Sequence, residues 1–244
     1  MDIIRASSPV GPARGVAGRL RVATRGFFFA MNRTTFIVDG FNLYHSVEDA
    51  ARQLGLGSRG TKWLDLRKLC ASYLHVIGGG ATLQQICYFS ALARHLEATK
   101  PDFMRRHQTY IQALQSTGVV VQLSRFKAKE IRCPKCGSHN VRHEEKETDV
   151  ALAAKLFEVF ARDECDTVVI VTGDTDVAPA VRTASALYPS KAIAFAFPFA
   201  RKNNELAQLV RTSFHIRKEA YAAHQFSDPL RLPDGSAISK PSTW

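Results

Sequence analysis

The sequence predicts a three-layer α/β/α sandwich, in which helices cover both faces of a mostly parallel β-sheet. Short runs of apolar and β-branched residues alternate along the chain with segments whose apolar residues recur at helical spacing. The short runs are apolar at nearly every position, which is typical of parallel strands buried on both faces. The chain of 244 residues is long enough for one such domain with extensions and a small insert.

The expected strands are bounded by turn residues. The run TTFIV at residues 34–38 ends at the turn pair Asp39 and Gly40. The run at residues 84–90 follows three consecutive glycines, and the run at residues 119–123 follows Gly118. The same criteria predict further strands at residues 167–171, 191–197 and, at one edge of the sheet, 214–216.

Helical periodicity predicts the segments that connect these strands. Phe103, Tyr110, Ile111 and Leu114 share one face of a helix expected over residues 101–115. The strongest pattern of this kind spans residues 148–160. Further helices are expected at residues 42–53, 64–74, 177–187 and 205–211.

Both ends of the chain differ in composition from the predicted domain. Residues 1–32 are rich in arginine, glycine and serine, and indicate either a disordered extension or translation that starts at Met31. The domain itself is expected over residues 33–218, with a basic, cysteine-containing insert at residues 124–147. Residues 219–244 are expected to form a C-terminal tail, flexible from about Ser227.

Charge and cysteine content narrow the classes of function. The net charge of +11 and the pI near 9.7 favour a polyanionic partner, most often nucleic acid. Five scattered cysteines, an odd number, indicate reduced thiols and a cytoplasmic location. No apolar run approaches the roughly 20 residues that a membrane-spanning helix needs.

Four aspartates follow predicted strands or begin a predicted helix. Asp39 ends the first strand, Asp149 begins the helix at residues 148–160, and Asp174 and Asp176 follow the strand at residues 167–171. Each has a structural alternative as a turn residue or helix cap. Ligands of parallel sheets bind beyond the carboxyl ends of the strands, so convergence of these carboxylates there would form a binding site.

Clustered carboxylates favour a divalent metal. Carboxylate oxygens are the ligands of Mg²⁺ or Mn²⁺, and a bound ion can activate water for attack on a phosphodiester. Without a cation, the same carboxylates repel one another, which raises their pKa values. The hydroxyl groups of Thr172 and Thr175 orient the acids, contact phosphate or, as we favour, satisfy the turn backbone.

Three sequence blocks contain these aspartates: IVDGFNLY at residues 37–44, EEKETDVALA at residues 144–153 and VIVTGDTDVAPAV at residues 169–181. They resemble the signature blocks of NYN domains, in the PIN-like nuclease superfamily, and the sequence looks closest to the LabA-like branch. The resemblance spans residues 34–216 and implies a PIN-like, Rossmann-like domain with a metal-dependent ribonuclease site. The residues onto which the family's site falls are Asp39, Asn42, Asp149, Asp174 and Asp176.

The insert carries a candidate zinc site and a group of basic residues. Cys133, Cys136, His139 and His143 offer four ligands for structural zinc. The alternatives are a reduced loop without metal, or zinc shared between two chains of a homodimer. The basic residues suit the phosphate backbone of RNA, with a solvated loop as the alternative for any one of them; they are Arg125, Lys127, Lys129, Arg132 and Lys146.

Two functions remain open. The leading one is a ribonuclease, most simply an endoribonuclease, that uses Mg²⁺ or Mn²⁺ held by the aspartates. The alternative is a non-catalytic RNA-binding or regulatory module with the same fold. A phosphatase with an aspartate nucleophile is disfavoured, because such enzymes need a second acid two residues on and Phe41 stands there.

Overall fold

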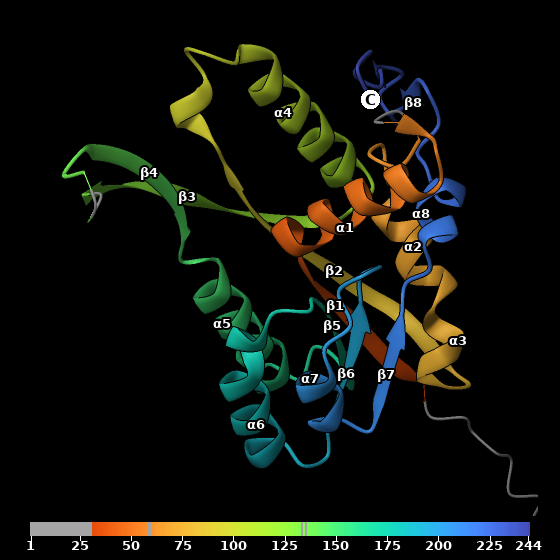
Figure 1. Ribbon diagram of the computed structural model, residues 1–244. Helices are drawn as coiled ribbons and strands as arrows, with labels where there is room; N and C mark the ends of the chain where they lie inside the picture. The colour runs from red at the N-terminus through yellow and green to blue at the C-terminus, as the bar shows by residue number, and fades with distance from the viewer. Residues whose placement is uncertain (1–30, 58–59, 133, 135) are drawn as a thin grey trace, which may run out of the picture.

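The computed structural model describes residues 31–57, 60–132, 134 and 136–244, without the side chains of residues 140 and 142–146. Its main sheet has seven strands, of which six are parallel and one edge strand is antiparallel. Helices cover both faces, so the predicted three-layer α/β/α fold is confirmed (Figure 1). In spatial order the strands are β4 (His139–Lys146), β3 (Val120–Arg132), β2 (Ala81–Leu92), β1 (Asn32–Asp39), β5 (Thr167–Val171), β6 (Ala192–Phe197) and β7 (Thr212–His215).

Alternate residues of the strands supply two separate core layers. Phe36 and Val38 of β1 pack on one face, whereas Ile37 between them packs on the other. The first layer is covered mainly by α1 (Gly40–Gln53), α2 (Leu66–Ser72), α4 (Pro101–Ser116) and α8 (Lys218–Ala223). The second is covered by α5 (Thr148–Ala161), α6 (Ala178–Leu187) and α7 (Asn204–Gln208).

Strand β1 lies at the point where the chain changes direction across the sheet. On one side it pairs with β2, which leads to β3, and on the other with β5, which leads to β6 and β7. The first strand and the strand at residues 167–171 are therefore neighbours. Their carboxyl ends lie together, with Val38 opposite Val171. In open α/β sheets, a crevice for ligands forms at such a switch point.

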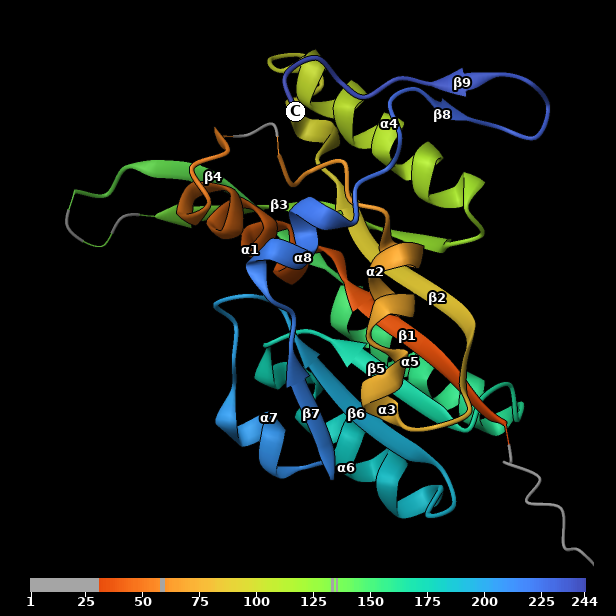
Figure 2. The same cartoon turned by 90° about the vertical axis from the view of Figure 1, so that its right-hand side faces the viewer.

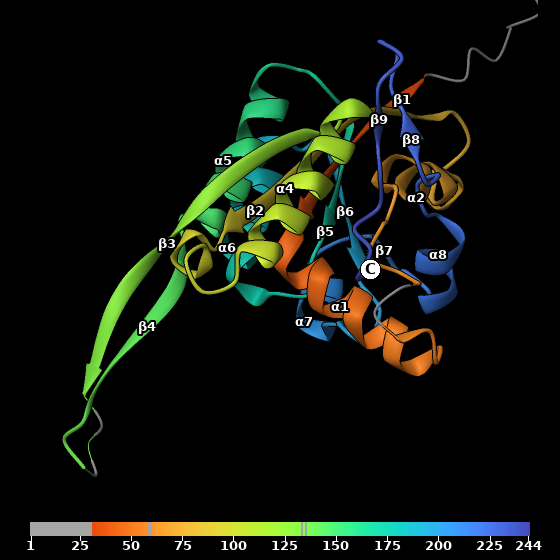
Figure 3. The same ribbon diagram turned by 90° about the horizontal axis from the view of Figure 1, so that it is seen from above.

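The largest difference from the sequence prediction lies in the insert. Strand β3 continues well beyond the expected residue 123, and β4 returns antiparallel to it. We call the segment from Arg125 to the end of β4 the arm. Its described residues are mostly exposed, and it projects from the body of the molecule (Figures 1 and 3). Because the described residues beyond Phe126 are mostly exposed, the arm lacks the apolar pattern by which strands are predicted.

The C-terminal segment also differs from the flexible tail expected after Ser227. Its backbone forms a small hairpin, β8 (Leu230–Arg231) with β9 (Ala237–Ile238), beside α4 (Figure 2). The ring of Trp244 then packs edge-on against Tyr110, with 5.8 Å between ring centres. One large aromatic side chain thus anchors a segment that has few other apolar residues.

The remaining short elements complete the chain. A single helical turn, α3 (Leu74–Ile77), follows α2, and a 3₁₀ turn at Arg94–Leu96 precedes α4. A second 3₁₀ turn, Thr175–Val177, leads into α6. Among the described residues, no helix has the length and apolar character required to cross a membrane.

Candidate active site

Asp39 occupies the carboxyl end of β1 and is almost completely buried, with 6% of its surface exposed. One carboxylate oxygen accepts a hydrogen bond from the backbone N–H of Asn42 at 3.0 Å and thereby caps α1. The other oxygen accepts from the Thr172 hydroxyl group at 2.9 Å. Asp39 therefore caps α1, which was the structural alternative for this residue, and it also contacts the loop that follows β5.

That loop is held in place by three further hydrogen bonds. The Thr172 hydroxyl oxygen accepts from the Asp174 backbone N–H at 3.1 Å. The Asn42 side-chain oxygen accepts from the Gly173 N–H at 3.1 Å, and the Asn203 side-chain amide donates to the Gly173 carbonyl at 3.2 Å. The loop and the start of α1 are thus joined by polar contacts across the switch point.

Asp174 and Asp176 differ in their surroundings. Asp174 is half-buried and caps the 3₁₀ turn by accepting the Asp176 N–H at 3.1 Å. Asp176 itself is exposed. Asp149 lies in the first turn of α5, where a carboxylate is favoured by the helix dipole. It follows Thr148, which is buried.

The aspartates influence one another electrostatically. Burial raises the pKa of Asp39 above its usual range, and the charge of Asp174 raises it further, although hydrogen bonds from Asn42 and Thr172 oppose these effects. Although Asp149 is an exposed residue, partial desolvation of its carboxyl group raises its pKa. The charges of Asp39, Asp174 and Asp176 raise the pKa of Asp149 further.

The donor atoms of this cluster suit a hard divalent cation. They are carboxylate oxygens, and the mutual repulsion of the carboxylates would be relieved by a cation. In the part of the chain that the structure describes, no three Asp, Glu, His or Cys side chains are close enough to ligate one ion directly. Carboxylate oxygens are the ligand type of an ion such as Mg²⁺, which keeps several waters and uses few direct carboxylate ligands.

The other expected site residues lie in the arm. Arg125 and Lys127 approach Glu147, at 3.0 and 3.4 Å, just before α5. Lys129 and Arg132 are exposed farther along β3. The side chain of Lys146 lies outside the described part of the structure.

The zinc prediction cannot be placed in full on the structure. Cys133 and the side chain of His143 lie outside what it describes. Cys136 is exposed, with its sulfur 3.2 Å from the Ser138 hydroxyl oxygen, and His139 is exposed as well. The four-ligand zinc site therefore stays a prediction.

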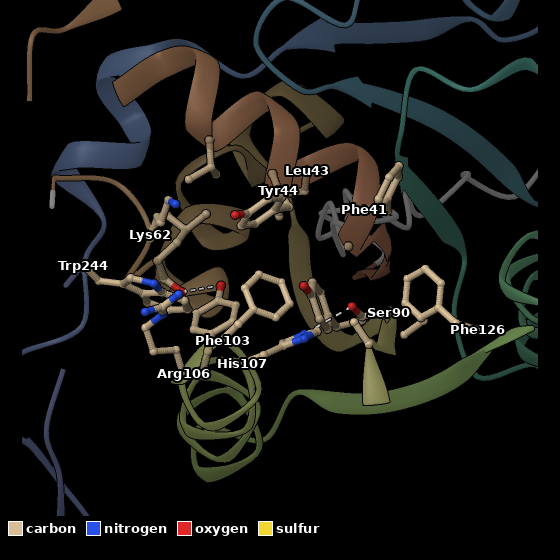
Figure 4. Close-up of a pocket in the computed structure, with 17 residues that line it drawn as sticks. Phe41, Leu43, Tyr44, Lys62, Ser90, Phe103, Arg106, His107, Phe126 and Trp244 are labelled. Carbon is tan, nitrogen blue, oxygen red and sulfur yellow. Dashed lines mark hydrogen bonds between the residues drawn. The ribbon is translucent and has the colours of Figure 1, made fainter. Parts of the chain in front are cut away.

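Sequence patterns did not reveal two features of this region. The first is Asn203, which ties Gly173 to the start of α7; its place directly before a predicted helix was the available signal. The second is an aromatic pocket that begins at Gly40 and Phe41, directly after Asp39 (Figure 4). Its residues come from separate segments, so no local spacing indicates it.

Comparison with known proteins identifies the family. The model of the NYN domain family matches residues 33–223. No curated protein matches the chain. A crystal structure of a protein of unknown function from Vibrio parahaemolyticus is similar, at 16% sequence identity and a TM-score of 0.49, over 77% of this chain and 94% of that one. With the family model covering most of its length, the chain belongs to the NYN domain family, within the PIN-like nuclease superfamily.

Proposed function

We propose that the protein is a divalent-metal-dependent ribonuclease that cleaves phosphodiester bonds within RNA strands. The observation that carries the proposal is the electrostatic coupling of Asp149 to Asp39, Asp174 and Asp176 at the switch point of the sheet. The charges of the other three aspartates make the ionised form of Asp149 less favourable and so raise its pKa. A bound cation would remove this repulsion. Membership of a nuclease superfamily supports the same chemistry.

The four aspartates would hold Mg²⁺ or Mn²⁺, partly through water. The bound ion would polarise the phosphodiester and lower the pKa of an attacking water molecule. Thr172 orients Asp39 by donating to it, and Asn42 holds the loop of Asp174 by accepting from Gly173. These two residues therefore act as positioning residues for the carboxylates.

The basic residues of the insert would hold the RNA strand. Arg125 and Lys127 lie at the base of the arm, next to Glu147 and close in sequence to Asp149. Lys129 and Arg132 would extend the contact along β3, and Lys146 would contact phosphate near the carboxylates. Neutralisation of phosphates by such residues releases counterions, so the affinity should fall as salt rises.

Three further proposals concern the whole chain. The nuclease domain starts at residue 33 and follows residues 1–32; residues 219–244, expected as a tail after residue 218, include most of α8 and Trp244, which pack on the domain. A cytoplasmic location agrees with the buried free thiols of Cys70, Cys87 and Cys165. Cys133, Cys136, His139 and His143 bind structural zinc, either within one chain or between two chains of a homodimer. Metal analysis of Cys136→Ser protein tests this last proposal, since zinc should be lost.

The ribonuclease proposal is tested by cleavage of end-labelled single-stranded RNA in the presence of Mn²⁺. We expect internal cleavage by the natural sequence and a loss of at least about a hundredfold in Asp39→Asn or Asp174→Asn. Asp234→Asn, in the exposed turn of the C-terminal hairpin, is the matched control and should retain full activity. Equal cleavage by all variants would place the activity elsewhere or in a contaminant.

One observation favours the alternative of a non-catalytic RNA-binding module. The described residues contain no ready-made set of three metal ligands. If that arrangement persists when RNA binds, the fold would hold RNA without hydrolysing it. Salt-sensitive RNA binding without cleavage in Mg²⁺, Mn²⁺ or Co²⁺ would select this function over the ribonuclease.

A further inference from the structure

A cavity of about 160 Å³ lies between α1, α4 and β2, on the face of the sheet that α1 covers. Aromatic side chains from several distant segments line it, and Figure 4 shows how they surround the space. They include Phe41 and Tyr44 from α1, Phe103 from α4, Phe126 from β3 and Trp244 from the C-terminal segment.

The cavity begins at the residues that follow Asp39 in the chain, although none of the four aspartates lines it. Its wall includes Gly40 and Phe41, which directly follow Asp39. A Cβ atom added at Gly40 would lie 2.5 Å from the Phe89 carbonyl oxygen, so the backbone after Asp39 is packed tightly against β2. Phe41 is 54% exposed and faces Phe126 at one end of the cavity (Figure 4).

Polar groups are few, and most are already paired. Lys62 contacts Glu48 at 2.9 Å and lies 5.3 Å from the centre of the Tyr44 ring. Arg106, by contrast, donates to the Thr243 hydroxyl group at 3.2 Å and has no carboxylate partner among the described residues. An unneutralised guanidinium beside an aromatic cavity suits a ligand that joins a flat ring to a negative charge.

Inside the cavity, two neutral groups can form hydrogen bonds with the edge of such a ring. The Ser90 hydroxyl oxygen and His107 Nε2 are 3.4 Å apart. Burial lowers the pKa of His107, which keeps the imidazole neutral and able to both donate and accept hydrogen bonds. A cavity of about 150 Å³ holds a benzene molecule in other proteins, so this one has room for a six-membered aromatic ring such as that of a pyrimidine base.

We propose that this cavity binds one base of the RNA strand, next to the phosphate that is cleaved. Phe41 and Phe126 stack on the base, Ser90 and His107 contact its edge, and Arg106 contacts a neighbouring phosphate. The inference rests on the proposed ribonuclease function and adds a base-binding subsite to it. Stacking on aromatic side chains tolerates any base, so the subsite requires a base without selecting its identity by stacking.

The test measures binding of a single-stranded RNA octamer to Asp174→Asn protein, which is disabled for cleavage. Fluorescence anisotropy compares the intact octamer with octamers that lack one base at successive positions. We expect one position at which loss of the base weakens binding by about 5- to 100-fold. Phe41→Ala and Phe126→Ala should weaken binding of the intact octamer by a similar factor. The same variants should weaken binding of the octamer that lacks that base only slightly further.

Matched controls separate the pocket from general effects. Leu187→Ala removes an exposed apolar side chain from α6, on the other face of the sheet, and should leave binding unchanged. Arg106→Gln should weaken binding, whereas Arg105→Gln, in the same helix but paired with Asp102, should not. Circular dichroism and thermal unfolding show whether each variant folds.

The possible outcomes distinguish this inference from the proposed function. Equal binding of the intact octamer and every base-lacking octamer overturns the subsite, even if the natural sequence cleaves RNA. Base-dependent binding that requires Phe41, without cleavage by the natural sequence, supports the subsite and overturns the ribonuclease. Failure to bind any octamer at low salt overturns both.

Discussion

At the residue scale, the Thr172 hydroxyl group connects the carboxylate of Asp39 to the backbone of Asp174. It donates to Asp39 and accepts from the backbone N–H of Asp174, and Thr172 is completely buried. A threonine at this position thus fixes the spacing between the end of β1 and the loop after β5. The sequence indicated that Thr172 either orients the acids or satisfies the turn, and the structure shows both roles in one side chain.

Replacement of Thr172 by valine should therefore lower both the free energy of unfolding and the rate of RNA cleavage. Valine keeps the shape but leaves a buried carboxylate oxygen and a backbone N–H without their partner, at a cost of about 1–3 kcal/mol. Urea unfolding measures the loss, and RNA cleavage should fall in parallel. Thr172→Ser keeps the hydroxyl group and should retain most of both. If valine and serine behave alike, the hydroxyl group does not position the carboxylates.

The raised pKa values predict how pH and metal affect stability. At pH values just above 3.8, the ordinary pKa of an aspartate, the unfolded chain has released the protons of Asp39 and Asp149. The folded protein still holds these protons, because both pKa values are raised. The contribution of these two groups to the stability of the metal-free protein should therefore fall as pH rises from 3.8 through the raised pKa values. Carboxylates whose pKa is lowered by cations, such as Asp166 beside Arg33, contribute with the opposite sign, so the contribution is measured as the difference between the natural sequence and a variant. Because Mn²⁺ binds the ionised carboxylates, it should raise the melting temperature more at about pH 7 than at about pH 5.

Asp149→Asn provides the matched variant for this measurement. It removes one repelling charge, so the metal-free protein should melt at a higher temperature near neutral pH. The stabilisation by Mn²⁺ should shrink in the same variant. Asp234→Asn, in an exposed turn, should leave the stabilisation by Mn²⁺ unchanged. A Mn²⁺ effect that is independent of pH and of Asp149 would contradict binding at this cluster.

At the scale of elements, the central strands could be predicted from the sequence and the arm could not. The strand expected at residues 167–171 coincides with β5, because all five residues are buried and apolar or β-branched. Strand β3 was expected to end at residue 123, but it continues to Arg132 through mainly exposed positions. Pairing with β4, the next strand along the chain, supports these positions. Because the described residues there are mostly exposed, they carry no alternation of apolar and polar residues that would predict a strand.

The arm should contribute to RNA affinity through charge. In a double variant, Lys129→Gln with Arg132→Gln, we expect weaker binding of single-stranded RNA and a shallower dependence on salt. The slope of log affinity against log salt should decrease by about 0.7 for each phosphate that the variant no longer neutralises. Anisotropy titrations over a range of salt concentrations measure this slope.

A double variant of equal charge change provides the control for the arm. Arg67 is exposed on α2, and Arg211 is exposed directly before β7, at the opposite end of the strand from the site. Arg67→Gln with Arg211→Gln should leave the slope almost unchanged. Equal effects from the two double variants would mean that the overall charge of +11, and not the arm, attracts RNA.

At the scale of the whole molecule, the sheet order brings the candidate site together. Asp39 and Asp174 are distant in sequence but adjacent in space, because β1 and β5 are neighbouring parallel strands. The sequence predicted this convergence through the rule for ligand sites in parallel sheets. The aromatic pocket depends on contacts among α1, α4, β3 and Trp244, and such contacts follow only from the complete tertiary structure.

The position of a bound ion tests the proposed metal site most directly. Crystals soaked in Mn²⁺ give an anomalous difference map that locates the metal without reference to activity. We expect a peak among the carboxylates of Asp39, Asp149 and Asp174, and no such peak in crystals of Asp174→Asn. A peak confined to another part of the molecule, or none in an accessible site at saturating Mn²⁺, would contradict metal binding by these aspartates.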